Sequence, residues 1–350
     1  MEQIKNFNTT TGLTDYEISM IKNIMKKYNI NVKYIEKIRS VYKIKTEDKF
    51  LCLKKMKHGK MKPVNGNILV QELKKNKFNN VPMYIKTNNN KLFVKYKGFI
   101  FYLIEWIDGE ECRMKNLDEA VNCAKLLGEF HLATSKIENK KLYNIKDDSR
   151  KWDKVFIKYL NDIKRYEKII DKKDIVSEFD ILYKENISYF YNQGIFAFNL
   201  LNKSHYNKLI SSKEKTICHD SYYYQNIIKK NDDYYIVDLD SIIINLKIYD
   251  LGKMISRLMY SSHYKWNFNK AKILIEAYNS VNKLSYEEME TMLAYIVFPR
   301  KFWKLGKKRY VKNKNWIENK YIHKLKRIIE LKGKEKKFVE EYRIYLYDFI

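Results

Sequence analysis

The stretch Thr216–Ser241, TICHDSYYYQNIIKKNDDYYIVDLDS, decides the fold of this chain. It places His219 seven residues before Asn226, and it ends with Asp238 and Asp240 after a short apolar run. Transfer of a phosphoryl group needs oxygen ligands for Mg²⁺ and a residue that positions the accepting hydroxyl. The spacing therefore predicts a phosphate-handling loop followed by a metal site at the end of a strand.

The same stretch predicts a β-hairpin. Asn226–Lys230 and Tyr234–Asp238 are strand-like, and turn-forming Asn and Asp residues separate them. Asp238 ends the second strand and Asn226 ends the preceding loop, so we predict that both are metal ligands, with Asp240 adding negative charge. The alternative is that the two aspartates only terminate the strand.

Composition limits the classes of protein to which the chain can belong. Its 350 residues, 45% of them hydrophobic, suffice for two packed units, and its four cysteines form no C-x-x-C pair, which argues against a structural zinc site or a disulfide framework. No apolar run reaches the roughly 18 residues of a membrane-spanning helix, so no membrane partner is expected. The net charge of +27 favours acidic partners. Because the basic residues are spread out and form no recognisable binding module, nucleic acid is not an expected partner.

The first hundred residues predict an antiparallel sheet with one or two helices. A capping box at Thr14-x-x-Glu17 opens a helix through about Tyr28. Alternating apolar residues and turn signals indicate the strands. The strands are expected over Val32–Ile38, Val41–Glu47, Lys49–Met56, Met83–Thr87 and Leu92–Trp106, and a second helix over Asn67–Lys77.

After Trp106 the pattern changes to helices. Asn116-x-x-Glu119 caps a helix whose apolar stripe ends at His131, which we interpret as a core or interlobe residue rather than a catalytic one. The hairpin is the only strand-like part expected in this half. Further helices are expected over Asp153–Ile170, Ile248–Tyr260, Ala271–Val281 and Glu287–Tyr295.

The order of these elements predicts the fold class. A small β-rich lobe, residues 1–105, precedes a large helical lobe, residues 106–350, which contains the hairpin. This arrangement is typical of an α+β, bilobal, protein kinase-like fold.

A lysine of the small lobe is the expected phosphate contact. Lys54 ends the apolar run Phe50–Leu53, from which it could reach phosphates; Lys55 and Lys57 are rivals, and an ordinary surface lysine is the alternative. Glu72, on the next expected helix, is the nearest candidate to orient Lys54 through an ion pair.

Four segments resemble a known superfamily. They are LLGEFHLAT (Leu126–Thr134), ICHDSYYYQNII (Ile217–Ile228), YIVDLDSIIINLKIYDLGKMI (Tyr235–Ile255) and FPRKFWKLGKKRY (Phe298–Tyr310). They resemble the aminoglycoside/choline kinase-like superfamily and, more closely, spore coat proteins of the CotS type. The resemblance covers most of the chain and is most specific in the second half.

The resemblance implies ATP and Mg²⁺ as cofactors, with an ATP cleft at a hinge near Glu105–Ile107. It implies that Lys54 contacts phosphates, that Asn226 and Asp238 hold the metal, and that Asp250 is a structural acid at a helix start. It also implies other spore coat proteins as partners, with the chain first in the mother-cell cytoplasm and then in the spore coat.

The chain departs from the superfamily at its catalytic loop. Active members read His-Gly-Asp there, whereas this chain has His219-Asp220-Ser221, so a serine stands in the place of the acid. Loss of a general base typically lowers the rate about 10²–10⁴-fold. In addition, the segment Ile35–Asp48, where a phosphate-cradling loop is expected, contains no glycine.

Two functions therefore remain open. One is a degenerate kinase, a pseudokinase, that acts in coat assembly and binds Mg²⁺–nucleotide. The alternative is an ATP-dependent phosphotransferase that acts on the hydroxyl of a small molecule and uses Asp220 as an unusual base.

A basic, aromatic segment follows near the end of the chain. Residues Arg300–Lys320 carry nine Lys or Arg residues and one acid, interleaved with Phe302, Trp303, Tyr310 and Trp316. The segment is either an amphipathic helix whose aromatic residues pack on the large lobe, or a docking surface for anionic coat partners.

Overall fold

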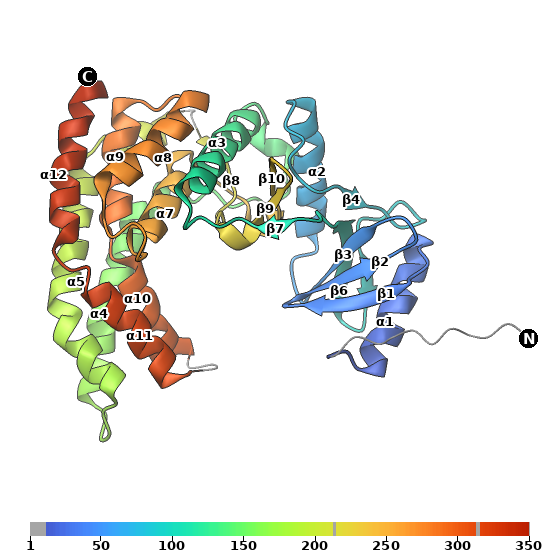
Figure 1. Cartoon of the computed structure of the whole chain (residues 1–350), viewed down its shortest axis with the longest axis horizontal. Coiled ribbons are helices and arrows are strands. Elements are labelled where there is room, and N and C mark those ends of the chain that lie inside the picture. Colours follow the sequence, from blue (N-terminus) through green and yellow to red (C-terminus); the bar gives the residue numbers. More distant parts are fainter. Residues whose placement is uncertain (1–11, 213–214, 313–315, 350) are drawn as a thin grey trace, which may run out of the picture. The chain divides into compact units, whose positions relative to one another are not determined.

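The computed structural model describes residues 12–212, 215–312 and 316–349. The chain forms two compact units, each built from several segments (Figure 1). The first unit comprises Met1–Cys112, Lys136–Ile145 and Tyr223–Ile242, and the second comprises Arg113–Ser135, Lys146–Tyr222 and Ile243–Ile350. In this division the hairpin of the opening stretch belongs to the first unit, and the expected boundary between residues 105 and 106 stays a prediction.

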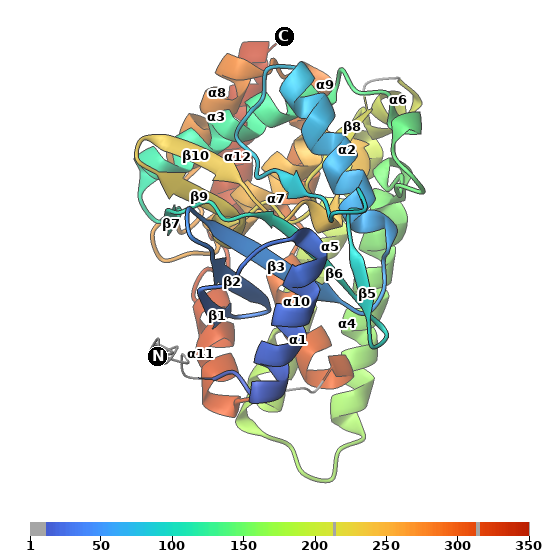
Figure 2. The same ribbon diagram turned by 90° about the vertical axis from the view of Figure 1, so that its right-hand side faces the viewer.

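An antiparallel sheet forms the centre of the first unit. Its strands lie in the order β1 (Tyr34–Ile38), β2 (Val41–Lys45), β3 (Phe50–Met56), β6 (Phe99–Glu105) and β4 (Tyr84–Ile85), and β5 (Val94–Tyr96) pairs with β6. Helix α1 (Asp15–Met25) lies against this sheet (Figure 2) and begins with the predicted capping box at Thr14. Its buried side chains share one hydrophobic core with Leu51, Leu53, Phe101 and Leu103.

Two predictions for the first unit need correction. Helix α2 (Met61–Lys75) starts before the predicted Asn67, because Pro63 lies in its first turn, where proline costs no hydrogen bond. At Gly66 of this helix a Cβ would lie 2.0 Å from the Tyr84 hydroxyl, so the glycine serves close packing rather than a turn. The run Leu92–Trp106 is not one strand, because it turns back at Gly98, whose φ is +76°.

The predicted hairpin is confirmed. Strands β9 (Ile227–Lys230) and β10 (Asp233–Ile236) pair antiparallel, with Ile227 opposite Ile236. A third short strand, β7 (Glu110–Glu111), pairs with β9 on its other edge. The hairpin is therefore part of a small second sheet. Its pairing fixes the positions of Asn226, just before β9, and of Asp238, just after β10.

The second unit is helical. Helix α3 packs on α8, and α4 runs along α5 (Figure 1). No helix of the described residues is long and apolar enough to cross a membrane. The helices are α3 (Leu117–Thr134), α4 (Trp152–Asp171), α5 (Glu178–Lys203), α6 (Tyr206–Ser211), α7 (Ile248–Met259), α8 (Phe268–Val281), α9 (Tyr286–Val297), α10 (Arg300–Lys307), α11 (Glu318–Ile329) and α12 (Lys334–Leu346).

The expectation that the hairpin is the only strand pair after Trp106 was wrong. Strands β8 (Lys215–Cys218) and β11 (Ile243–Leu246) also pair antiparallel, on either side of the hairpin in the sequence. Both are short runs buried on both faces, which periodicity does not distinguish from helix. The pair fixes the start of the loop that follows Cys218.

The basic, aromatic segment packs as a helix, as one of the two alternatives predicted. Phe302 and Trp303 of α10 are buried. The Phe302 ring stacks on Tyr183 with centroids 4.1 Å apart, and the Trp303 ring stacks on Tyr159 at 3.5 Å. Residues 313–315 of this segment lie outside the described residues.

Candidate functional site

A cavity of about 450 Å³ lies within the first unit. Its lining contains six of the seven residues predicted to hold nucleotide or metal. These are Lys54, Glu105, Ile107, Asn226, Asp238 and Asp240. The hairpin and the central sheet thus bring residues that are more than a hundred positions apart in sequence to one cavity.

Lys54 is the centre of this group. Its Nζ lies 2.5 Å from Asp238 Oδ1 and 3.2 Å from Asp240 Oδ2. Burial disfavours the charged ammonium, but the two carboxylates outweigh burial and hold the pKa of Lys54 above its ordinary value. The rivals Lys55 and Lys57 have no such contacts among the ion pairs of the described residues. Lys54 is therefore a permanent cation in the cavity.

Asp240 is more central than the sequence indicated. Its Oδ2 also accepts a hydrogen bond from the Tyr102 hydroxyl at 2.5 Å. Its Oδ1 is buried and has no hydrogen-bond partner among the described residues. A buried carboxylate oxygen without a donor is costly, so this atom fits a cation that completes the site.

The backbone holds Asp238 and Asn226 at the mouth of the hairpin. Asp238 has φ 67° and ψ 58°, a left-handed conformation that non-glycine residues seldom adopt and that often marks a functional site. The Val237 N–H donates to the Asn226 carbonyl at 3.0 Å, which ties the two ends of the hairpin together. Both residues line the cavity.

Two predicted residues have other roles in the first unit. Glu72 does not orient Lys54, because its carboxylate accepts from Lys75 at 2.6 Å and from Lys141 at 2.7 Å. The helix register points it to these partners. The Glu105 carboxylate accepts from the Met83 N–H at 2.9 Å, so this side chain fixes the sheet edge, and the backbone of Glu105–Ile107 borders the cavity.

Sequence reasoning missed Arg39, which also lines the cavity. Ile38 pairs with Val41, so only Arg39 and Ser40 form the turn between β1 and β2. Arg39 has φ 55°, and its guanidinium lies 2.5 Å from Glu111. A two-residue hairpin turn needs a positive φ, a conformation that usually selects glycine or asparagine. An arginine at such a position was therefore a usable sequence signal that its side chain has a function.

The loop with the predicted catalytic residues belongs to the second unit. The carboxylate of Asp250 accepts from the backbone N–H groups of His219 at 2.6 Å and Asp220 at 3.0 Å. The Ser221 N–H donates to His219 Nδ1 at 3.2 Å. Burial alone would raise the pKa of Asp250, but His131 and nearby cations outweigh it and hold this pKa below its ordinary value. Asp250 is thus an ionised anchor for the loop.

Asp220 is held by two side chains of α7. Its Oδ1 lies 2.5 Å from Lys253 Nζ and 2.7 Å from the Tyr249 hydroxyl, and Lys253 also donates to the Asp220 carbonyl. Burial lowers the pKa of Lys253, Asp220 opposes this effect, and Arg300 adds to it. Tyr249 and Lys253 were not predicted, although their spacing of four places them on one face of a helix.

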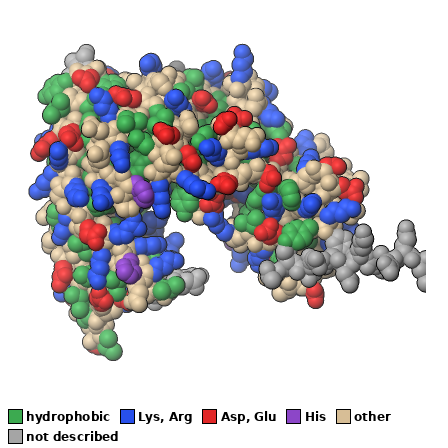
Figure 3. Space-filling model, in the orientation of Figure 1, with side chains coloured by type: hydrophobic (Ala, Val, Ile, Leu, Met, Phe, Trp, Pro, Cys, Tyr) green, Lys and Arg blue, Asp and Glu red, His purple; other side chains and the backbone are tan. Residues whose placement is uncertain are grey.

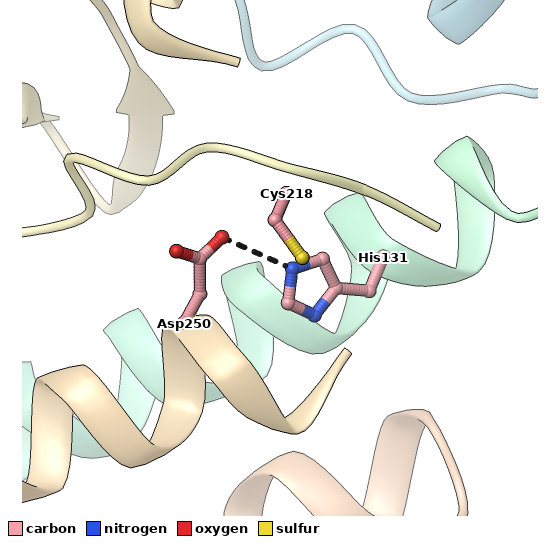
Figure 4. Close-up of side chains that lie close together, drawn as sticks. All are labelled: His131, Cys218 and Asp250. Atoms are coloured by element: carbon pink, nitrogen blue, oxygen red, sulfur yellow. Dashed lines mark hydrogen bonds and ion pairs between the residues drawn. The ribbon is translucent and has the colours of Figure 1, made fainter. Parts of the chain in front are cut away.

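Figure 4 shows a buried group beneath this loop, formed by His131, Cys218 and Asp250. Their potential ligand atoms lie within 4.8 Å of one another. However, His131 Nδ1 is 2.8 Å from the Tyr278 hydroxyl, the Asp250 oxygens receive the loop N–H groups, and Cys218 donates to the Leu246 carbonyl at 3.4 Å. We interpret the group as a packed hydrogen-bond network, as predicted for His131.

Solved structures with the same fold are phosphotransferases. An aminoglycoside phosphotransferase from Alicyclobacillus acidocaldarius subsp. acidocaldarius DSM 446 matches with a TM-score of 0.81 at 14% identity, over 97% of this chain and 98% of the other. Spectinomycin phosphotransferase in complex with ADP and spectinomycin matches with a TM-score of 0.66 at 15% identity, over 95% and 100% of the two chains. Amicoumacin kinase with AMP-PNP and Ca²⁺ matches with 0.66 at 14% identity, over 93% and 94%. The α+β, bilobal, kinase-like fold is thereby confirmed.

Sequence comparison then defines the family. Spore coat protein S of Bacillus subtilis (strain 168) is 20% identical over 349 residues, which cover 93% of this chain and 95% of the relative. The family described as "Spore coat putative kinase YutH" matches residues 21–342. The chain belongs to this family of kinase-like spore coat proteins, and the predicted resemblance is confirmed.

Proposed function

We propose that this chain is a spore coat pseudokinase that binds Mg²⁺–nucleotide in the cavity of its first unit and has lost most of its phosphotransfer activity. Its role is in coat assembly, next to other coat proteins, after synthesis in the mother-cell cytoplasm. The observation that carries the proposal is that Lys253 and Tyr249 contact Asp220 Oδ1. It is supported by the resemblance to the superfamily, which implies an acid at the position of Ser221.

The cavity residues fit both cofactors. Asp238, Asn226 and Asp240 offer the hard oxygen atoms that Mg²⁺ prefers, and the unpartnered Asp240 Oδ1 supports this fit. Lys54 and Arg39 supply positive charge for phosphates. When bound, Mg²⁺ would neutralise phosphate charge.

The short turn at Arg39 weakens one expected contact. Kinase-like folds cover the phosphates with backbone N–H groups of a glycine-rich loop. Here two residues connect β1 and β2, and the only charge at that turn comes from the Arg39 side chain. The cavity is therefore equipped to hold a nucleotide, while the contacts that favour its reaction are reduced.

Ser221 explains the loss of chemistry. A serine hydroxyl cannot accept a proton near neutral pH without an activating base. His219 Nδ1, two residues before it, accepts the Ser221 backbone N–H at 3.2 Å. A rate about 10²–10⁴-fold below that of an active relative is the expected result.

One observation favours the alternative, a small-molecule phosphotransferase that uses Asp220. The Asp220 side chain is 33% exposed, and its φ of 59° is left-handed. Strained backbone of this kind is common at active sites. In this case the acceptor would be a small-molecule hydroxyl.

A thermal-shift titration with Mg²⁺–ATP tests the proposal. We expect stabilisation that requires Mg²⁺ and disappears in Asp238→Asn, with Glu72→Gln as a control because its carboxylate lies outside the cavity lining. No stabilisation of the wild-type chain at millimolar Mg²⁺–ATP would refute nucleotide binding.

A further inference from the structure

The second unit carries a cluster of cations beside the loop Asp220–Tyr222. We call it the α7–α10 cluster; it consists of Lys253 and Arg257 on α7 and Arg300, Lys301 and Lys304 on α10. Lys and Arg side chains gather on the surface over α10 and α11 (Figure 3). The function proposed above gives these residues no role apart from Lys253.

Hydrogen bonds connect the cluster to the loop. Lys301 Nζ donates to the Arg257 carbonyl at 2.9 Å, and the Arg257 guanidinium donates to the Tyr222 carbonyl at 3.0 Å. Lys253 Nζ contacts Asp220 Oδ1. These bonds join Lys253, Arg257 and Lys301 to the loop, and Lys304 interacts electrostatically with Arg257, Arg300 and Lys253.

Arg300 is oriented by aromatic rings. Its guanidinium carbon lies 4.9 Å from the centre of the Tyr295 ring and 5.8 Å from that of Tyr159. In the part of the chain that the structure describes, no carboxylate forms an ion pair with Arg300 or Lys304. A guanidinium held by its face keeps its N–H edge for a bidentate anion.

The charges around Lys301 are all positive. Arg257 on α7, Lys304 on α10 and Arg327 on α11 face it, and its ammonium lies 5.4 Å from the centre of the Tyr260 ring. Burial together with these cations lowers the pKa of Lys301 to about 7. Burial, together with Arg257, Arg300, Lys253 and Lys312, lowers the pKa of Lys304 as well. Crowding of this kind opposes folding, so an anion that enters would relieve repulsion.

We propose that the α7–α10 cluster binds the phosphate group of a small phosphorylated molecule. A phosphate can accept from Arg300 and Lys304 together, because these residues lie one turn apart on α10 and neither has a carboxylate partner among the described residues. The same charges would repel an amine, so the ligand class is anionic. The site lies in the second unit and does not depend on nucleotide binding in the first unit.

Isothermal titration with inorganic pyrophosphate, without Mg²⁺ and at 150 mM salt, tests the site. We expect saturable binding of one equivalent, weakened at least about tenfold in the double variant Arg300→Gln/Lys304→Gln. The matched control is Lys203→Gln/Lys336→Gln, which removes the same charge from exposed positions on α5 and α12 and should bind as the wild type does. The single variant Arg300→Lys should bind pyrophosphate more weakly than the single variant Lys304→Arg, because only Arg300 needs the planar guanidinium for bidentate contact.

Proton uptake on binding distinguishes a specific site from non-specific attraction of an anion to this basic protein. At pH 7.5, binding should take up a proton in wild type and much less in Lys301→Met, measured in two buffers with different ionisation enthalpies. Lys54→Met should keep pyrophosphate binding while losing the Mg²⁺–ATP response, so each proposal can fail alone. Three results would overturn the phosphate site. They are an equal loss of pyrophosphate binding in both double variants, the absence of saturable binding, and tighter binding of hexaglutamate than of pyrophosphate at the same residues.

Discussion

Two aspartates illustrate how single residues define this molecule. Asp220 and Asp238 both have left-handed backbone, with φ of 59° and 67°, which costs about 1–3 kcal/mol each. Each has a lysine partner at 2.5 Å, Lys253 and Lys54. The ion pairs hold these strained residues in place. In each pair the lysine also occupies a carboxylate oxygen, which Asp238 would use to bind a metal and Asp220 would use to accept a proton.

At the residue scale, Lys54→Met should lower stability as well as nucleotide binding. Asp238 and Asp240 would lose their shared cation, and Asp240 is largely buried. We expect a loss of about 1–3 kcal/mol in the free energy of unfolding, measured by urea denaturation. Lys55→Met is the control, because Lys55 contacts only the Phe99 and Phe101 rings among the described residues; an equal loss in both would contradict the role of Lys54.

A second residue-scale prediction concerns pH. The folded-state pKa of Lys301 is about 7 against an ordinary 10.5, so between these values the unfolded chain holds a proton that the folded chain lacks. The free energy of unfolding should therefore rise from pH 7 to pH 9. Lys301→Met should show a smaller rise, whereas Lys336→Met should keep it. An unchanged slope in Lys301→Met would show that Lys301 keeps its ordinary pKa.

At the scale of elements, the sequence predicted those helix caps and turns that depend on contacts between neighbouring residues. The capping box at Thr14, the helix cap at Asn116 and the hairpin of residues 227–236 form as predicted, because neighbouring residues determine them. The strands β8 and β11 and the long helix α5 were missed, because the burial that selects them comes from distant segments.

Helix α10 gives the prediction at this scale. Phe302 is fully buried between Tyr183 and Phe190, with ring centroids 4.1 and 4.3 Å away. Phe302→Ala should cost about 3–5 kcal/mol in the free energy of unfolding, measured by chemical denaturation. The exposed Val311→Ala in the same segment should cost little. A loss below 1 kcal/mol at Phe302 would mean that the segment is a detachable docking surface.

At the scale of the whole molecule, the sequence predicted most of the cavity residues of the first unit, but only part of the loop site of the second unit. Motif spacing identified Asn226, Asp238 and Asp240, and the end of an apolar run indicated Lys54. The fold brings all four to one cavity. The Glu72 pairing was wrong because helix register is not readable from one sequence. Tyr249, Lys253 and the α7–α10 cluster acquire meaning only from tertiary contacts.

The most direct test measures binding and transfer together in the same samples. Wild type should gain about 2.7 kcal/mol of stability when Mg²⁺–ATP is 100-fold above its Kd, while γ-phosphate release or transfer stays about 10²–10⁴-fold slower than in an active relative. Ser221→Asp should raise the rate at least about 10²-fold, because it puts a carboxylate at the position that lacks the general base. Turnover by the wild-type chain that Asp220→Asn abolishes would contradict the account and establish Asp220 as the base.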